Sequence, residues 1–366
     1  MADPTSMVFL GSPLNTLTGY GRDAVGLVTG ALDLGWDVYL ENLSNVNPPL
    51  EQRVCDLVGK HPPLECDMVL RLGPPHQIEP MCSGSDFKAF VYWTMWEWTT
   101  LNLDSDIQHK LAEVLEHVTH LVAYDAQSLS ALRGFCATHG IFHPRPVQHM
   151  GGIEADMWRP LPAAPVQRHW ERGKPFRFLM SGRLSGRKLP YLAAQAFTDL
   201  KNDPDVEFDD AELHIKTLSE VEVDPCLSSD DLRLRVHLGD WSQPKLRSFY
   251  AAGNVLVAPS RGEGKNNPAM EMMTGGGTVI ATDWGGHAEW LDDSYAYPLD
   301  YELVPHLDDA LWAAPDFEHL KKLMLQAYND RGEARAKAEK AMRVIPERFD
   351  WPAVMAGLAQ KVLGDG

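Results

Sequence analysis

The chain has 366 residues, of which 44% are hydrophobic and 23% are charged. This length exceeds one ordinary α/β domain and suits two domains, each with a core of its own. Lysine and arginine total 33 against 51 aspartates and glutamates, a formal net charge of −18. Such an acidic chain is not expected to adhere broadly to nucleic acid or to anionic membranes, because that adhesion needs a positive field.

The cysteines and the apolar runs indicate the compartment. The 5 cysteines are scattered and include no Cys-x-x-Cys pair, so we expect a reducing cytoplasm and no zinc site. No apolar run reaches the length of about 18 residues that marks a membrane-spanning helix. The run at residues 7–10 lacks a preceding basic region and is interpreted as a first strand rather than a signal peptide. We therefore expect a cytoplasmic protein without stable membrane insertion; a homo-oligomer is compatible with this composition.

Apolar periodicity predicts alternating strands and helices along the first half of the chain. The expected strands are residues 7–10, 36–40, 68–72, 90–93 and 120–123. The expected helices are residues 23–34, 48–63, 105–117 and 125–138. This alternation is typical of a doubly wound parallel sheet.

A second alternating series follows a proline- and glycine-rich stretch at residues 144–165, where we place the domain boundary. The expected strands are residues 177–181, 212–216, 234–238, 255–258 and 278–281. The expected helices are residues 190–200 and 243–252, a short helix between the last two strands, and a tail helix over 333–362.

The segment 253–289 carries the strongest candidate site. Two buried strands enclose a loop with Glu263 and a helix with Glu271, which ends at a run of three glycines. The two glutamates are eight residues apart, so both can face one crevice at the carboxyl ends of the strands. Carboxylates suit vicinal diols of sugars because each oxygen accepts a hydrogen bond. The alternative is one solvated loop glutamate and one surface helical glutamate.

The loop at residues 182–188 follows a strand and contains Arg183, Arg187 and Lys188. These cations can neutralise a diphosphate, or they can simply be solvated. Near Glu263, small and polar residues would let backbone N–H groups approach an anion. The candidates there are Ser260, Gly264, Lys265, Asn266 and Asn267.

Three weaker signals lie elsewhere. Gly19 and Gly21 precede a helix and suit either a phosphate or a sharp turn, but they do not form a dinucleotide fingerprint. An aromatic cluster after a strand suits either sugar stacking or core packing; its members are Trp93, Trp96, Glu97 and Trp98. Asp-x-Asp patterns at 104–106 and 203–205 match metal-bound nucleotide-sugar sites, but such short patterns occur by chance and are better explained as helix caps.

The segment PSRGEGKNNPAMEMMTGGGTVIATDWGGHAE resembles the signature of the retaining GT-B glycosyltransferases of family 4, the glycosyl transferases group 1. The pattern comprises Pro-Ser, Glu-Gly, a second glutamate eight residues after the first (EX7E), a glycine stop and Thr-Asp-x-Gly-Gly-x-x-Glu. SGRLSGRK resembles the Gly-Arg-x(n)-Lys diphosphate loop of that family, and GYGR and YWTMWEWTTL resemble acceptor-domain elements of some members. The chain departs from the pattern at Lys265-Asn266, where members usually carry an aromatic residue and glycine, and no first-domain histidine motif is evident.

This resemblance implies an α/β chain with the GT-B fold, two Rossmann-like doubly wound domains that face a central cleft. Residues 1–155 would bind the acceptor, residues 156–345 the nucleotide sugar, and the helix in 346–366 would pack back on the first domain. The implied activity is retaining transfer of a hexose from a UDP- or GDP-linked sugar to an acceptor hydroxyl, without a metal or other cofactor. A non-transferring GT-B enzyme (epimerase, hydrolase or phosphorylase) and a catalytically silent sugar-binding protein are the alternatives.

The resemblance also assigns roles to residues. Arg183 and Lys188 would grip the diphosphate, Glu263 would contact the transferred sugar and Glu271 the ribose. The further donor-side candidates are Ser260, Gly264, Lys265, Asn266, Asn267, Gly19 and Gly21. Trp93, Trp96, Glu97 and Trp98 are the acceptor-side candidates. The acceptor is left open among a glycan, a lipid, a protein, a small metabolite and a modified nucleobase.

Overall fold

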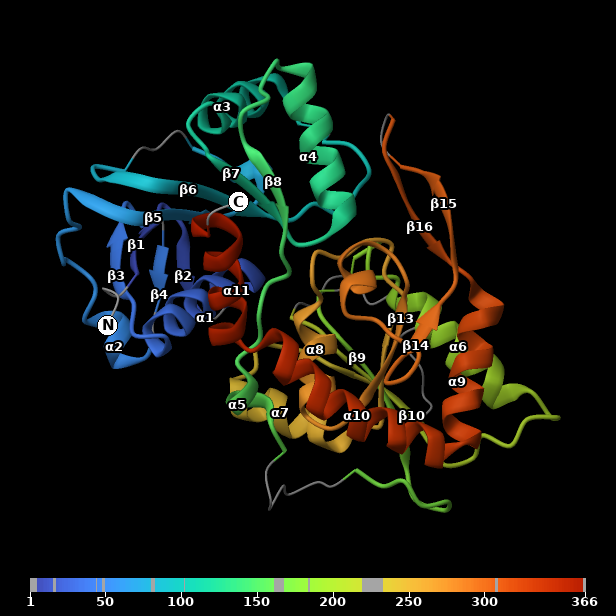
Figure 1. Cartoon of the computed structure of the whole chain (residues 1–366). Helices are drawn as coiled ribbons and strands as arrows, with labels where there is room; N and C mark the ends of the chain where they lie inside the picture. The colour runs from blue at the N-terminus through green and yellow to red at the C-terminus, as the bar shows by residue number, and fades with distance from the viewer. Residues whose placement is uncertain are drawn as a thin grey trace. The chain divides into compact units, whose positions relative to one another are not determined.

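The computed structural model describes residues 5–15, 18–43, 45–47, 50–79, 83–101, 103–160, 168–183, 185–218, 233–306 and 309–364. The chain forms two compact units (Figure 1). Unit 1 contains residues 1–154, 305–311 and 347–366, and unit 2 contains residues 155–304 and 312–346.

Unit 1 is built on a six-stranded parallel sheet in the order β3-β1-β5-β6-β7-β8. The strands are β1 (Ser6–Leu10), β3 (Asp37–Glu41), β5 (Glu65–Leu72), β6 (Asp86–Thr94), β7 (His120–Ala123) and β8 (Arg145–Gln148). A small parallel pair, β2 (Pro13–Asn15) with β4 (Asn45–Asn47), lies beside it. The helices are α1 (Gly19–Asp33), α2 (Gln52–Cys55), α3 (Ser105–Leu115), α4 (Ala126–Thr138) and α11 (Trp351–Leu363).

The two faces of this sheet are covered by different helices because successive strand residues point to opposite sides. Val8, Val69 and Tyr92 belong to the core shared with α3 and α4. On the other face α1 packs against α11, where Trp351 leaves no room for a side chain at Gly26. The unit is therefore a three-layer α/β/α sandwich, as its alternating sequence predicts.

Unit 2 repeats this plan with the sheet order β11-β10-β9-β12-β13-β14. Its strands are β9 (Phe176–Ser181), β10 (Ala211–Lys216), β11 (Leu234–His237), β12 (Val255–Ala258), β13 (Thr278–Thr282) and β14 (Tyr297–Leu299). Its helices are α5 (Ala155–Trp158), α6 (Pro190–Asn202), α7 (Gln243–Ala252), α8 (Asn267–Thr274) and α9 (Phe317–Asn329). The hairpin β15 (Tyr301–Pro305) and β16 (Leu311–Pro315) precedes α9, and α10 (Arg331–Phe349) follows it.

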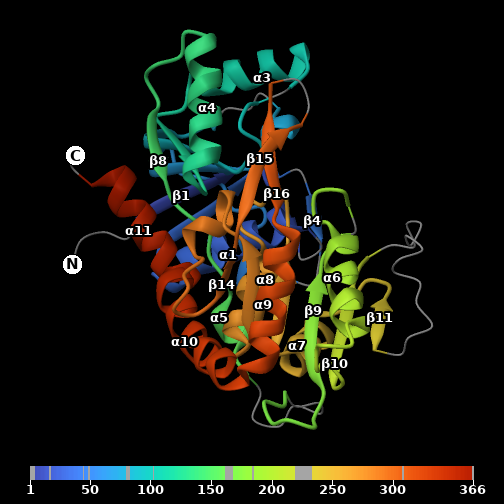
Figure 2. The same ribbon diagram turned by 90° about the vertical axis from the view of Figure 1, so that its right-hand side faces the viewer.

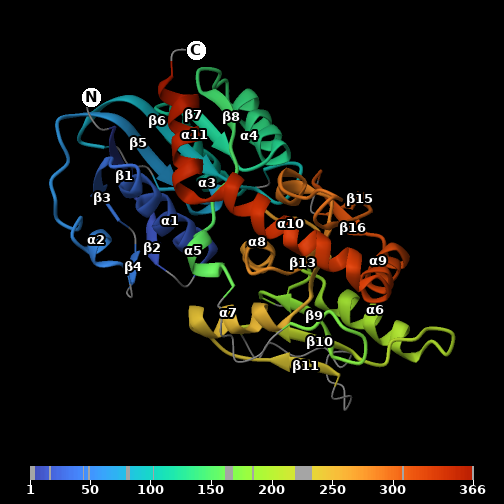
Figure 3. The same ribbon diagram turned by 60° about the horizontal axis from the view of Figure 1, so that its bottom comes forward.

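The main core of unit 2 lies between its sheet and the helices α6 and α9, which can be followed in Figure 2. Phe176, Phe178 and Leu213 point into this core from β9 and β10. Helix α7 lies on the other side of the sheet, beside β9, β10 and β11 (Figure 3). The doubly wound parallel architecture predicted for each half is thus confirmed.

Several predicted elements were wrong in extent. The helix expected over 48–63 is reduced to α2, because Gly59 adopts a positive φ of 85° and two prolines follow at 62 and 63; Pro48 and Pro49 lie outside the described residues. The tail helix expected over 333–362 is two helices, since Asp350 has extended backbone and α11 begins after it, with Pro352 in its first turn. Strand β8 lies in the stretch that was expected to be a linker, and α9 and the hairpin were not predicted.

Candidate functional site

Three loops of unit 2 meet at the carboxyl edge of its sheet. They follow β9, β12 and β13, which are adjacent and parallel. Because parallel strands end at the same edge, the cations after β9 and the glutamate after β12 come together, as does the turn after β13. This is the edge where ligands bind in open α/β sheets.

The centre of the site is the carboxylate of Glu263, which is 6% exposed. Lys188 Nζ donates to Glu263 Oε1 at 2.5 Å, and Arg187 Nη1 lies 3.0 Å from Oε2. Ser260 Oγ donates to Oε1 at 2.9 Å. Burial alone favours the neutral acid, but the charges of Arg187 and Lys188 outweigh it and hold the pKa of Glu263 well below its usual range. The cluster formed by Glu263, Arg187 and Lys188 therefore carries a net positive charge.

The backbone around these cations is unusual in ways that hold them in place. Gly182 has a φ of 139°, and a Cβ there would lie 3.1 Å from the Lys188 side chain. Leu189, the N-cap of α6, is in the left-handed conformation, with φ at 48°. The Arg187 guanidinium donates to the Gly262 carbonyl, and the Arg187 carbonyl accepts from Arg261 N at 2.8 Å. The cation loop is therefore tied to the Glu263 loop at both its side chains and its backbone.

The turn after β13 closes on the Glu263 loop from the other side. Gly286 N donates to the Glu263 carbonyl at 2.8 Å, and a Cβ at Gly286 would lie 1.7 Å from the Gly264 carbonyl oxygen. Trp290 Nε1 donates to the Lys265 carbonyl at 2.8 Å. The approach of the two backbones requires glycine at 286.

Asn266 and His287 add a side-chain link between the same two segments. Asn266 has a φ of 65°, in the left-handed region that glycine usually occupies, and its Nδ2 donates to His287 Nε2 at 2.9 Å. His287 Nδ1 in turn donates to the Thr282 carbonyl at 2.9 Å. These partners assign the neutral tautomer with its proton on Nδ1. Burial lowers the pKa of His287 to about 4, partly opposed by the charge of Glu263.

Helix α8 starts directly after this loop, with Asn266 as its N-cap. Glu271 lies on α8 and is 3% exposed. The far end of the helix is anchored by Arg168, whose guanidinium donates to the carbonyls of Gly275 and Gly276 and to Tyr250 O at 2.9 Å. Burial lowers the pKa of Arg168 to about 10, so the group stays charged at neutral pH and complements the negative end of the helix. The positive end of α8 thus points into the loop that carries Glu263.

Most residues predicted for the donor side lie in the interlocked loops or on α8. Lys188, Ser260, Glu263, Gly264, Lys265 and Asn266 lie in the interlocked loops, and Asn267 and Glu271 lie on α8. Arg183 is exposed, and the arginine that pairs with Glu263 beside Lys188 is Arg187, which the sequence placed among the loop cations but not in the chosen set. His287 was missed; its position beside the two glycines of the last signature element was the available signal.

Gly19 and Gly21 lie in the first turn of α1 and belong to unit 1, whereas Glu263 belongs to unit 2. Gly21 N donates to Thr18 Oγ1 at 3.0 Å, and a Cβ at Gly21 would lie 2.4 Å from Asn15 Oδ1. Here glycine is required by the close approach of Asn15.

The aromatic cluster is divided between core and surface. Trp93 is fully buried and its Nε1 donates to the His149 carbonyl at 3.0 Å, while Trp96 is 4% exposed and its Nε1 donates to Thr100 O at 2.8 Å. These two rings fill the interior of unit 1, the alternative that the sequence left open. Trp98 and Glu97 are partly exposed and keep an acceptor-side role available.

The Asp-x-Asp patterns serve local structure. Asp104 caps α3, accepting from Ile107 N at 3.0 Å, and Asp203 Oδ1 accepts from Asp205 N at 3.0 Å in the turn after α6. Within the described residues, no cluster of histidine, cysteine and carboxylate side chains could hold a metal ion. Among the helices of the same ranges, none has the length and apolar composition needed to cross a bilayer.

A comparison with known protein families finds one that unit 2 resembles. Residues 175–329 match the model of the family described as glycosyl transferases group 1. This segment covers most of unit 2, including Lys188, Glu263 and Glu271. Unit 2 is similar to that family over this segment. No curated protein matches the chain significantly.

The whole chain has the GT-B fold of known glycosyltransferase structures. Sucrose-phosphate synthase from Thermosynechococcus elongatus aligns with a TM-score of 0.64 and 13% identity, over 98% of each chain. HepE from Anabaena, solved with UDP and glucose, aligns with a TM-score of 0.64 and 12% identity over 99% of this chain and 100% of its own. WaaG, a glycosyltransferase of lipopolysaccharide biosynthesis, aligns with a TM-score of 0.63 and 15% identity over 98% and 100%. The predicted fold is thus confirmed.

Proposed function

We propose that the protein is a retaining glycosyltransferase that moves a hexose from a UDP- or GDP-linked sugar to an acceptor hydroxyl. The observation that carries the proposal is the convergence of Arg187, Lys188 and the amino terminus of α8 on Glu263. This arrangement sits at the ligand-binding edge of the sheet, in the segment that matches the model of the glycosyl transferases group 1. HepE, a structure of the same fold, was solved with UDP-glucose, which favours a nucleotide-sugar donor.

The positive side chains match the charge that develops on a departing diphosphate. When the bond between the anomeric carbon and the phosphate oxygen breaks, negative charge grows on that oxygen. Lys188 and Arg187 are already held in place, so they can stabilise this charge with little reorganisation. Arg183, which is exposed near the start of the same loop, would also contact the diphosphate when it binds. The protein then supplies with side chains the positive charge that a metal would otherwise provide.

In a retaining reaction, the acceptor oxygen forms its new bond to the anomeric carbon on the same face of the sugar from which the phosphate departs. The acceptor proton passes to the departing phosphate oxygen, so atoms and charge balance without a protein base. Glu263 would accept hydrogen bonds from the hydroxyls of the transferred sugar, and Glu271 from the ribose diol. The acceptor would be recruited by unit 1, where Glu97 and Trp98 are partly exposed.

Binding is tested first, because it needs no acceptor. Calorimetry with UDP, GDP and ADP should show one nucleotide bound in the presence of EDTA, and Lys188→Met should weaken that binding at least tenfold. Lys322→Met removes an exposed lysine of α9 and serves as the matched control. Release of nucleoside diphosphate from the corresponding sugar donor should be lost in Lys188→Met and in Glu271→Ala. Full turnover in either folded variant, or binding that depends on a divalent metal, would refute the proposal.

A further inference from the structure

The hairpin β15–β16 begins at the edge of the sheet that carries the Glu263 loop. Strand β14 runs parallel to β13 and ends at Leu299, and β15 begins at Tyr301. The first residues of the hairpin therefore lie at the carboxyl edge, where ligands bind in open α/β sheets. Residues 301–304 and 312–315 belong to unit 2 and form the base of the hairpin, which can be followed in Figure 2. We call these residues the hairpin base.

Strand β16 is bonded to the loop that carries Glu263. Ala313 N donates to the Arg261 carbonyl at 2.9 Å, and Arg261 Nη1 donates to the Ala313 carbonyl at 3.5 Å. The Arg261 guanidinium also lies over the ring of Trp312, 4.6 Å from its centroid. At this distance a cation is attracted to the face of an indole ring. Two consecutive residues of β16 thus hold both the backbone and the side chain of Arg261.

Arg261 is also bonded to the loop that carries the cations. Its backbone N–H donates to the Arg187 carbonyl at 2.8 Å. The Arg187 side chain donates to the Gly262 carbonyl and lies 3.0 Å from Glu263 Oε2. A displacement of Arg261 would therefore disturb Arg187 twice, through its own backbone and through the loop that its guanidinium contacts.

Strand β15 contacts the third loop of the site, the turn after β13. The ring of Tyr301 lies against that of Trp284, with the two centroids 5.5 Å apart. Trp284 directly precedes Gly285 and Gly286, and Gly286 N donates to the Glu263 carbonyl at 2.8 Å. The two strands of the hairpin base thus contact the two loops that meet at the backbone of Glu263.

We propose that the hairpin base is a clamp that positions Arg187 for the departing diphosphate, and that Arg261 and Trp312 are positioning residues of the donor site. The role of Arg187 rests on the proposed function, whereas the clamp rests on the contacts described above. A cation stabilises developing charge only when it is already in place, and a displacement of about 1 Å can lower a rate about a hundredfold. Lys188 and the amino terminus of α8 would still bind the diphosphate, so the clamp should affect turnover more than nucleotide binding.

Hydrogen exchange on the full chain tests the clamp without any substrate. Trp312→Leu and Arg261→Gln each remove the contact between the cation and the ring, and each should speed exchange in peptides from residues 259–266 by about fivefold or more. Because both substitutions act on one contact, the double variant should exchange no faster than the faster single variant. Trp312→Phe keeps an aromatic face beside Arg261 and should exchange at a rate close to that of the wild type.

Turnover separates positioning from a general loss of stability. Release of nucleoside diphosphate from UDP-glucose or GDP-glucose, whichever the wild type consumes, should fall about tenfold or more in Trp312→Leu and in Arg261→Gln. The Kd of UDP or GDP, measured by calorimetry, should rise by less than about threefold, because Lys188 remains in place. A contact that served only stability would lower the melting temperature and leave the turnover of the folded molecules unchanged. Trp312→Phe should retain most of the turnover.

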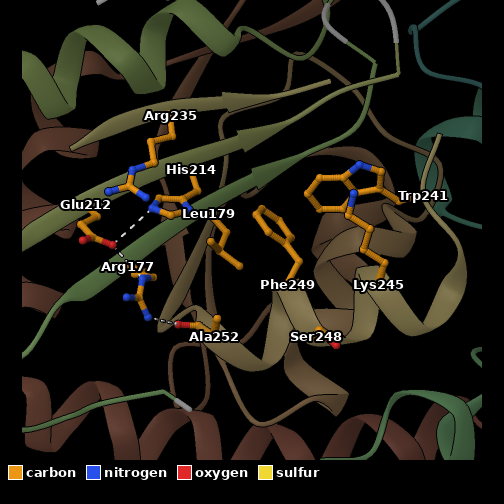
Figure 4. A pocket seen from close by; sticks show the side chains of 10 residues that line it. All are labelled: Arg177, Leu179, Glu212, His214, Arg235, Trp241, Lys245, Ser248, Phe249 and Ala252. Atoms are coloured by element: carbon orange, nitrogen blue, oxygen red, sulfur yellow. Dashed lines mark hydrogen bonds and ion pairs between the residues drawn. The ribbon is translucent and has the colours of Figure 1, made fainter. Parts of the chain in front are cut away.

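Two comparable pairs elsewhere in unit 2 supply matched controls. Lys245 Nζ lies 4.0 Å from the centroid of the Trp241 ring, in a groove beside α7 (Figure 4). Lys321 Nζ lies 5.3 Å from the centroid of the Phe317 ring on α9. Lys245→Gln matches Arg261→Gln, and Phe317→Leu matches Trp312→Leu. Both controls should leave turnover and the exchange of residues 259–266 unchanged.

The proposal is overturned if Trp312→Leu leaves the exchange of residues 259–266 unchanged, if the effects of the two substitutions add in the double variant, or if Phe317→Leu has the same effect as Trp312→Leu. It is also overturned if both folded variants turn over as fast as the wild type, or if nucleotide affinity falls by the same factor as turnover. A wild type that consumes neither nucleotide sugar would refute the proposed function instead, and the exchange experiment alone would then decide whether the clamp exists.

Discussion

Replacing Glu263 by glutamine tests the charge cluster directly. Glutamine keeps the size of the side chain and an oxygen that can accept from Ser260, but it removes the negative charge between Arg187 and Lys188. The two cations would then face each other, in a site where Lys188 is 13% and Arg187 25% exposed. Removing one partner from a buried ion pair costs about 3–5 kcal/mol, and the partial hydration of Arg187 favours the lower end, about 3 kcal/mol at pH 7.

The cost should depend on pH in a defined direction. The pKa of Glu263 is lowered in the folded protein, so its ionised form stabilises the fold above the unfolded pKa of about 4.3. That stabilisation is lost as the pH falls from there toward the folded pKa. The difference between wild type and Glu263→Gln should therefore be constant from pH 7 to about 5 and then narrow by up to about 1.4 kcal/mol per pH unit.

Hydrogen exchange of peptides from β12 and β13 measures the opening of unit 2 separately from unit 1. Glu318→Gln is the control, since it removes one carboxylate from an exposed pair with Lys321 and should cost less than about 1 kcal/mol. A difference between wild type and Glu263→Gln that stays constant down to pH 3 would show that Glu263 is not the ionised partner of these cations. A cost no larger than that of the control would lead to the same conclusion.

Three further predictions follow from the packing around the loops. Gly286→Ala should abolish nucleotide binding and destabilise unit 2 by about 1–3 kcal/mol, because its Cβ would overlap the Gly264 carbonyl; Gly186→Ala, with open space around it, should bind nucleotide normally. His287→Gln should flatten the pH dependence of hydrogen exchange in β13, because the pKa of His287 is lowered and its neutral ring contributes stability above pH 6.5 that is lost toward pH 4; an unchanged slope would show that the folded protein does not hold this ring neutral. In unit 1, Gly26→Ala should lower the melting temperature through its clash with Trp351, whereas Gly134→Ala, which meets no neighbour in α4, should leave it unchanged or raise it.

The regular parts of the fold could be predicted because their signals are local. Strands such as β12 and β13 are short apolar runs that end in turn residues, and their alternation with helices identifies the parallel sheet. The expected helix over 48–63 failed because a left-handed glycine and following prolines stop it after one turn. Strand β8 was missed because it lies in a stretch crowded with prolines and glycines that suggested a linker, yet its own proline, Pro146, is tolerated because β8 is the edge strand of the sheet.

The site was predictable as a set of loops but not as a set of contacts. The spacing of Glu263 and Glu271 and the cations after β9 indicated which segments matter. Whether Arg183 or Arg187 reaches Glu263 depends on how the loop turns at Gly182 and Leu189. The backbone angles of Gly182 and Leu189 are set by the tertiary structure. Trp93 was ambiguous for a similar reason, since its burial depends on His149 and on α11, far away in the sequence.

The departure from the family pattern at Asn266 is explained by His287. The backbone at 266 is left-handed, where members usually carry glycine, and asparagine is among the few other residues that adopt this conformation readily. Its amide is buried and needs a partner, and the neutral ring of His287 accepts from it while remaining bonded to Thr282. The Trp290 bond to the Lys265 carbonyl and the Gly286 bond to the Glu263 carbonyl fix the same loop at two more points. A loop that would otherwise carry a flexible glycine is thus fixed at residues 263, 265 and 266, so the unusual residues stabilise the geometry on which the proposed donor site depends.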